Sequence, residues 1–347
     1  MSNPPRNQSI FKLGRFSIAG CTPFTGLVFN DESVVALRAL TSIAAVSAEA
    51  RAAFRGDESM RDLLESWPHY LDALRKAIAG EGAAEAIKRS AVPLSALQIH
   101  APVMPRQIFC TIANYHSGAI EAVLDKAAKT NDPASAKSVA SAVLDACQHR
   151  VRHGEPYVAS KLSSAVIGPY DPIPIPASAL QVDWEVELGV VIGTGGYAIR
   201  REDAMRHVAA YTVVNDITAR DLIARSDVPA MGTDWLKAKS GPGFLPVGPF
   251  LVPACEINDP YTLHMSLRLN GTTMQQECCR DMMFDIAAQI AHVSRHARLF
   301  PGDLICTGSP AGFGSHFGRF LRVGDVVEAT VAGIGAQRNA CIDTDIT

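Results

Sequence analysis

The chain has 347 residues, a length that fits two domains or one large domain with an appendage. With 48% hydrophobic and 19% charged residues it can bury a sizeable core, which excludes a disordered protein. Its 32 Lys and Arg against 35 Asp and Glu give a net charge of -3, which argues against a nucleic-acid partner, and no polybasic or long apolar run predicts membrane contact. Eight scattered cysteines and a start without an apolar signal segment predict reduced thiols and a cytoplasmic location.

The beginning of the chain is typical of a small N-terminal domain. Residues 1–30 contain two short strand-like runs separated by Gly and Pro, and residues 35–97 carry apolar positions at helical spacing. A stretch rich in proline and small residues at 93–106 is the predicted linker. We therefore predict one domain over residues 1–100 and a catalytic domain over 101–347.

The second part of the chain begins with Ala-rich helical sequence and then changes to short strands. Residues 119–153 are helical in pattern, and the strand-like runs after them are separated by Gly and Pro turns. Among these runs, LRLNGTTMQ predicts a hairpin through Asn270–Gly271. We expect an α+β protein whose mainly β catalytic domain is rolled or barrel-like, with a helical lid over residues 115–155.

The most informative stretch is VDWEVELGVVIG, which alternates as a single strand would and places Asp183, Glu185 and Glu187 on one face. Side chains two residues apart on a strand lie about 6.5–7 Å apart, so two carboxylates there can converge on one hard cation. Asp216, at the end of the apolar run AAYTVVND, is the expected third ligand. This donor set suits Mg2+ or Mn2+, with Ca2+ a possible substitute in crystals, whereas the alternative is an acidic, solvated strand face.

Four motifs occur in order along the chain: VDWEVELGVVIG, AAYTVVNDITARDL, KAKSGPGFLPVGPFLVP and GDLICTGSPAGFG. Together they resemble the fumarylacetoacetate hydrolase family over residues ~106–345. The resemblance implies a metal-dependent enzyme that acts on acylpyruvates or related 2-oxo acids, with a β-roll catalytic domain and usually a homodimer. It also implies metal-binding carboxylates at Glu185, Glu187 and Asp216.

The same resemblance implies residues that contact the substrate. It places Lys239 at the substrate oxygens, with the nearby Lys237 as the competitor for this role. It places Thr307 and Gly308 at the carboxylate or keto group, and a Gly-rich turn with free N–H groups can hold such an anion. Tyr115 completes the expected substrate-binding residues.

Arg220 follows Asp216 by four residues. If a helix begins at Ile217, the Arg220 side chain can turn back towards the site and contact the substrate. It can equally form a structural ion pair with Asp221 or with Asp216.

Family hydrolases typically carry N-Y-x-x-H-x-x-E, whose His and Glu activate water, but this chain reads NYHSGAIE. It keeps Glu121, has Gly118 at the usual His position and has His116 two residues earlier. A shift of two residues turns a side chain by about 200° on a helix, so His116 can be catalytic only if the segment is a loop over the substrate. His149 and His153 are the other histidines that could fold over the site.

Three functions are consistent with these residues. The first is a Mg2+- or Mn2+-dependent hydrolase that cleaves a carbon–carbon bond of an acylpyruvate in aromatic or related catabolism, with Glu121 and His116 activating water. The second is a decarboxylase, isomerase or dehydratase of a 2-oxo acid, because a metal can promote enolisation without the dyad. The third is a catalytically impaired protein that binds a metabolite.

His292 and His296 are spaced as zinc ligands are on a helix, but no Glu follows the first of them as in a zinc protease motif. We therefore expect an exposed or capping pair there and no zinc site.

Overall fold

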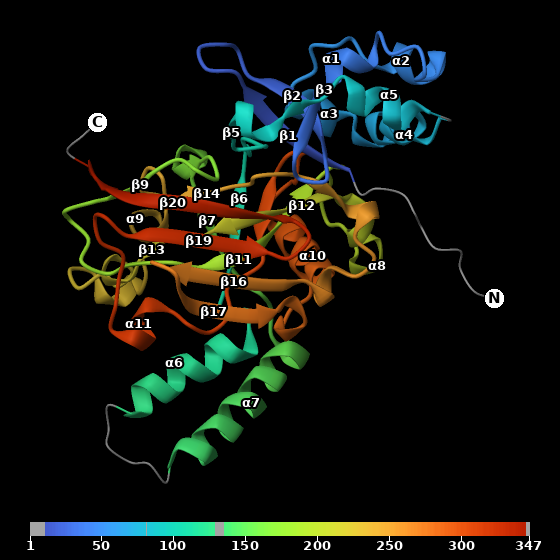
Figure 1. Cartoon of the computed structure of the whole chain (residues 1–347). Helices are drawn as coiled ribbons and strands as arrows, with labels where there is room; N and C mark the ends of the chain where they lie inside the picture. Colours follow the sequence, from blue (N-terminus) through green and yellow to red (C-terminus); the bar gives the residue numbers. More distant parts are fainter. Residues whose placement is uncertain (1–10, 81, 129–134, 345–347) are drawn as a thin grey trace.

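The computed structural model describes residues 11–80, 82–128 and 135–344. Figure 1 shows a sheet with short helices at the top, curled sheets in the middle, and the helices α6 (His116–Ala128) and α7 (Ser135–His153) projecting at the bottom. A search of the described residues finds no helix that is both long and apolar enough to span a membrane.

The N-terminal part is an antiparallel five-stranded sheet with short helices beside it. In sheet order the strands are β4 (Val92–Pro93), β3 (Ser33–Ala36), β2 (Phe24–Phe29), β1 (Lys12–Ser17) and β5 (Gln98–His100). The helices are α1 (Leu37–Leu40), α2 (Ala48–Ala53), α3 (Met60–Glu65), α4 (Trp67–Ala79) and α5 (Ala83–Arg89). The strand pattern predicted near the start and the helices predicted after it are both present.

The predicted linker over 93–106 is wrong in part. Strand β5 lies within it and pairs with β1, so that Arg15 faces His100 in the N-terminal sheet. Trp67 of α4 and Val190 of the central sheet also belong to one continuous hydrophobic core. The division into two domains stays a prediction.

Two mixed sheets, of six and five strands, follow, and both are curled and open at their edges in the described residues. The first, in order, is β15 (Val252–Pro253), β12 (Val208–Asn215), β11 (Val186–Ile192), β18 (Leu304–Cys306), β6 (Ile108–Ile112) and β7 (Tyr157–Lys161). The second is β17 (Thr272–Cys278), β16 (His264–Leu269), β19 (Val326–Val331), β20 (Gly335–Asp343) and β9 (Ile173–Ile175). The fold is therefore mixed α/β, with curled sheets where a closed barrel was one expectation.

Short elements complete the fold. The paired strands are β10 (Val182–Asp183) with β13 (Thr218–Ala219), and β14 (Leu245–Pro246) with β8 (Val166–Ile167). The remaining helices are α8 (Arg201–Ala204), α9 (Trp235–Lys239), α10 (Ile286–His296) and α11 (Gly314–Phe317). The predicted hairpin joins β16 to β17 through Asn270 and Gly271, whose φ angles of 50° and 82° fit a turn with two left-handed residues. All eight cysteines are free thiols, as predicted.

The stretch VDWEVELGVVIG is two strands, β10 and β11, and not the single strand that its alternation predicts. The Trp184 N–H donates to the carboxylate of Asp183, and the Glu185 N–H donates to the side-chain oxygen of Asn215. Side chains thus take the place of a neighbouring strand at these two residues and interrupt the ladder. Beyond the break, β11 and β12 are buried along their whole length in the middle of the sheet.

Helices α6 and α7 occupy the segment predicted as a lid, and their connection at 129–134 lies outside the described residues. Their role as a lid stays a prediction. They are inserted between β6 and β7, which are antiparallel neighbours, and Ile112 at the end of β6 faces Tyr157 at the start of β7. The chain therefore leaves the sheet for the lid and returns to it at the same place.

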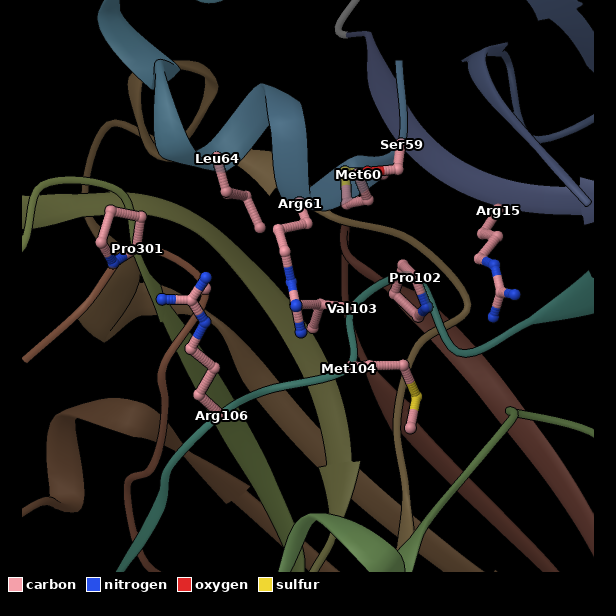
Figure 2. Close-up of a pocket in the computed structure, with 11 residues that line it drawn as sticks. Arg15, Ser59, Met60, Arg61, Leu64, Pro102, Val103, Met104, Arg106 and Pro301 are labelled. Atoms are coloured by element: carbon pink, nitrogen blue, oxygen red, sulfur yellow. The ribbon is translucent and has the colours of Figure 1, made fainter. Parts of the chain in front are cut away.

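A cavity of about 330 Å³ lies between α3, the segment after β5 and the turn at Pro301 (Figure 2). Arg15, Arg61 and Arg106 are among its lining residues, and Arg106 forms an ion pair of 2.6 Å with Glu65. No acidic side chain is among the residues that line it. It is therefore unsuited to a divalent cation, and the candidate active site lies elsewhere.

Candidate active site

The three carboxylates predicted to bind metal lie together at the end of the β11–β12 pair. Glu185 precedes β11, Glu187 lies on it, and Asp216 follows β12, with its N–H donating to the Glu185 carbonyl at 2.8 Å. All three are buried, and one oxygen from each lies within 4.8 Å of the others. The structure therefore brings together the three carboxylates that the sequence analysis singled out, and their role as metal ligands stays a prediction.

Two buried lysines hold Asp216 from opposite oxygens. Lys239 Nζ lies 2.5 Å from Asp216 Oδ2 and 2.8 Å from the Thr218 hydroxyl. Lys161 Nζ lies 2.5 Å from Asp216 Oδ1 and also donates to the backbone carbonyls of Ile217 and Phe244. Lys161 was missed by the sequence analysis, because a lysine at the end of an alternating strand has no local mark that separates it from an exposed one.

Arg220 joins the site by a different route from the one predicted. No helix begins at Ile217; β13 is followed instead by a 3-10 turn over Arg220–Leu222. Arg220 Nε lies 3.0 Å from Asp183 and a terminal nitrogen lies 2.8 Å from Glu185, while the guanidinium stacks over the Phe313 ring at 4.8 Å. Arg220 is thus both a structural ion-pair partner and a wall of the site.

The buried carboxylates of Asp216 and Glu187 have opposite pKa shifts. Burial alone would raise the pKa of Asp216, but the ammonium groups of Lys161 and Lys239 lower it below its usual value. Burial raises the pKa of Glu187 well above its usual value, and the negative charges of Asp216 and Glu185 add to this effect. A further positive charge beside Glu187 would therefore offset the cost of its buried negative charge.

The donor set fits a divalent cation of the Mg2+ or Mn2+ type. All three side chains offer hard oxygen ligands, which these ions prefer. A carboxylate accepts about four hydrogen bonds or metal bonds, so Asp216 keeps lone pairs after it has bound both lysines. A cation here would also neutralise the buried charge of Glu187.

A cavity of about 210 Å³ opens beside this cluster. Glu185, Arg220 and Lys239 line it, together with Tyr115 just before α6 and Gly118 on α6. Aromatic residues Trp235 and Phe313 also contribute to the wall. Lys239, Arg220 and Tyr115, all predicted to bind substrate, therefore face one space, and Lys237 is exposed and outside it.

Gly118, at the position of the usual dyad histidine, is packed against the loop that follows β18. A Cβ atom at residue 118 would lie 3.2 Å from the Phe313 ring and 3.3 Å from the Ser309 carbonyl oxygen. A larger side chain at position 118 would therefore have to displace this loop.

Glu121 and His116 are both engaged away from the cavity. Both oxygens of Glu121 lie 2.9 Å from the Gly312 N–H, and one accepts from the Phe313 N–H at 3.2 Å. His116 Nδ1 lies 2.8 Å from the Asp281 carbonyl oxygen, and its ring lines a separate depression beside α7. Neither residue is among those that line the cavity.

The other predicted residues have positions that support the site from outside. The Thr307 hydroxyl donates to the Leu188 carbonyl at 2.9 Å, and the Gly308 N–H donates to Glu187 Oε2 at 2.7 Å. A Cβ at Gly308 would lie 2.7 Å from that of Asn114, so this close approach requires glycine. His149 and His153 are exposed at the end of α7, and neither lines the cavity.

Two known enzymes are similar in sequence to part of this chain. The chain is 40% identical over 191 residues to oxaloacetate tautomerase FAHD2B, mitochondrial, of Homo sapiens, an alignment that covers 54% of this chain and 59% of that protein. It is also 40% identical over 189 residues to 2,4-didehydro-3-deoxy-L-rhamnonate hydrolase of Sphingomonas sp. (strain SKA58), which covers 53% of this chain and 64% of that protein. The alignments thus span about three fifths of the length of these relatives.

Solved structures match over nearly the whole chain. Maleylpyruvate hydrolase from Sphingobium sp. SYK-6, crystallised with manganese(II) and pyruvate, superposes with a TM-score of 0.66 at 26% identity, covering 96% of this chain and 99% of that one. A putative HpcE protein from Mycobacterium smegmatis superposes with a TM-score of 0.70 at 27% identity, covering 97% and 100%. The profile of the fumarylacetoacetate (FAA) hydrolase C-terminal family matches residues 107–342. The chain therefore belongs to the fumarylacetoacetate hydrolase family.

Proposed function

We propose that the protein is a divalent-metal-dependent tautomerase or isomerase of a small 2-oxo acid with a second carboxylate, of which oxaloacetate is the simplest example. The observation that carries this proposal is that the cavity lined by Glu185, Arg220 and Lys239 has Gly118 in place of the usual dyad histidine. A histidine does approach Glu121, since His316 Nδ1 lies 3.8 Å from Glu121 Oε2, but His316 is not among the residues that line the cavity. Gly118 replaces the histidine, and the carboxylate of Glu121 is bound to backbone N–H groups. The name of the human relative agrees with this reaction class.

Glu185, Glu187 and Asp216 would hold the metal, and a bound Mg2+ or Mn2+ supplies a Lewis acid for the carboxylate and 2-oxo oxygens of such a substrate. The chain's own groups would do the rest. The Lys239 ammonium, fixed by Asp216 and Thr218, would stabilise the negative charge that develops on the 2-oxo oxygen when the neighbouring carbon loses a proton.

Arg220 would bind the second carboxylate of the substrate. Its guanidinium has five N–H donors, and the contacts with Asp183 and Glu185 use only part of them. The Trp235 and Phe313 rings narrow the space around the substrate and limit the entry of water. Tautomerisation moves one proton from the carbon to the 2-oxo oxygen, or the reverse, and adds no water, whereas hydrolysis needs a base that activates water.

The Glu121→Gln variant separates the two reaction classes. If Glu121 only holds the loop at Gly312 and Phe313, a glutamine oxygen can accept the same hydrogen bonds, and we expect kcat to stay within about tenfold of wild type. A general base would lose about 100-fold or more. Steady-state rates on oxaloacetate and on an acylpyruvate, together with the melting temperature, make this comparison.

The reaction itself is tested by incubating the protein with enol-oxaloacetate and with acylpyruvates in H2(18)O, with Mg2+ or with EDTA. We expect metal-dependent decay of the enol absorbance and no carbon–carbon cleavage. Acylpyruvate cleavage that places one solvent oxygen in the new carboxylate would overturn the proposal. It would establish the hydrolase instead, the class to which the structurally similar maleylpyruvate hydrolase belongs.

A further inference from the structure

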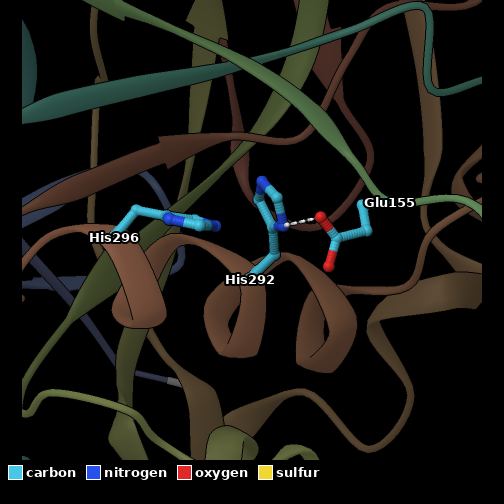
Figure 3. A group of neighbouring side chains, drawn as sticks. All are labelled: Glu155, His292 and His296. Atoms are coloured by element: carbon cyan, nitrogen blue, oxygen red, sulfur yellow. Dashed lines mark ion pairs between the residues drawn. The ribbon is translucent and has the colours of Figure 1, made fainter.

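A second group of metal-ligating side chains lies outside the active site, on the surface beside the end of the lid. His292 and His296 are one turn apart on α10, with ring centroids 4.9 Å apart. Glu155, which lies between α7 and β7, approaches them, and its Oε2 lies 3.8 Å from His292 Nδ1 (Figure 3). One ligand atom from each of the three residues lies within 4.8 Å of the others.

We propose that Glu155, His292 and His296 form a second metal site, which binds a transition-metal ion such as Zn2+, although the sequence alone predicts no zinc site at the two histidines. Glu155, which the sequence does not place beside them, supplies the third ligand. Imidazole nitrogen is a preferred ligand of Zn2+, Ni2+ and Cu2+, whereas Mg2+ prefers oxygen, so this site differs in kind from the carboxylate cluster. Two histidines and one glutamate, with water in the remaining position, form a donor set found at open zinc sites.

The three ligand atoms can reach the spacing of a zinc site by side-chain movement alone. Zinc bonds of about 2.0–2.1 Å in a tetrahedron place neighbouring ligands about 3.4 Å apart, so the three atoms must close by little more than about 1 Å. The Glu155 side chain is 59% exposed and is free to make this movement, whereas His292 is 13% exposed and is held by its surroundings. The i,i+4 spacing on one helix brings the two histidines together before any metal binds.

A cation already interacts with this group of residues. One nitrogen of Arg295 lies 2.7 Å from Glu155 Oε1 and 3.5 Å from His292 Nδ1. The guanidinium therefore occupies part of the space in which a metal ion would bind, and it repels such an ion. Because Arg295 is itself 53% exposed, it can swing into solvent when the metal enters.

A bound metal would connect the end of α7 to α10. Glu155 follows the last residue of α7 by only two positions, and the histidines lie on α10. Cys147 of α7 packs in one small cluster with Met283 and Phe284, just before α10. The metal would therefore fasten the end of the lid to the helix on which it already rests.

The test is a titration of the full chain with Zn2+ in excess Mg2+, followed by calorimetry, and with Co2+, followed by its visible absorption. We expect binding that His296→Ala weakens by at least about tenfold and that Arg295→Gln strengthens. His149→Ala is the matched control. His149 and His153 form another i,i+4 pair on α7, with ring centroids 4.7 Å apart. Among the described residues, however, no third ligand joins this pair in a group that could hold a metal.

Repeating the titration in the Glu187→Gln background separates this site from the carboxylate cluster. Retention of the His296-dependent binding there supports the proposal. Zn2+ binding that is unchanged in His296→Ala, that is lost in His149→Ala, or that disappears only in Glu187→Gln would overturn it. None of these outcomes depends on which reaction the active site catalyses.

Discussion

Replacing Lys161 with methionine is expected to lower the free energy of unfolding by about 3–5 kcal/mol, a larger loss than most single substitutions cause. The Lys161 side chain is fully buried against Asp216 Oδ1 and donates to two backbone carbonyls. Methionine fills similar space but leaves these oxygens without their donor and leaves part of the Asp216 charge uncompensated. Chemical denaturation of both proteins measures the difference.

Lys237→Met is the matched control for this experiment. Lys237 is exposed on α9, two residues from Lys239, so removal of its charge is expected to change the unfolding free energy by no more than about 0.5 kcal/mol. If both variants are as stable as wild type, the buried lysine is not the counter-charge of Asp216. The same pair of variants also separates a general loss of positive charge from the loss of this one contact.

Glu187→Gln is expected to abolish metal binding and to reduce activity by at least about 100-fold while leaving the fold intact. The pKa of Glu187 is raised by burial, so a neutral side chain is well suited to its position in the metal-free protein. The glutamine oxygen can still accept from the Gly308 N–H. The variant should therefore keep the fold and lose metal binding.

The measurement is the melting temperature with Mg2+ or Mn2+ and with EDTA. A ligand that binds only the folded state raises the melting temperature of wild type, and this rise should vanish in Glu187→Gln. Glu202→Gln, at a glutamate that is 67% exposed on α8, should keep both the rise and the activity. An active Glu187→Gln protein with a normal metal-dependent rise would remove Glu187 from the site.

Sequence reasoning predicted the residues whose signal is local. Glu185, Glu187 and Asp216 were found because acidic residues inside strongly apolar strands are unusual, and the Asn270–Gly271 turn because its type requires those residues. The helices α6 and α7 were visible in the same way from their periodicity. The family resemblance added Lys239 and Tyr115, which line the cavity.

Residues defined by distant partners were not predictable in this way. Lys161 is buried because Asp216, 55 residues later, accepts its charge. Glu155 meets His292 only because α7 ends beside α10. Glu121 has a plausible catalytic motif around it, but the loop at Gly312 decides what its carboxylate binds. The homodimer, the cytoplasmic location and the domain boundary stay predictions.

The helices α6 and α7 leave and rejoin the sheet at neighbouring strands, which makes changes in the length of this insertion inexpensive. Because β6 and β7 are hydrogen-bonded neighbours, the two ends of the insertion are already held together at Ile112 and Tyr157. Lengthening an insertion whose ends are fixed adds only slowly to the entropy of closing it, about 0.6 kcal/mol for each doubling of its length. An insertion at this place can therefore change in length at small entropic cost while strands β11 and β12, beside the carboxylate cluster, keep their register.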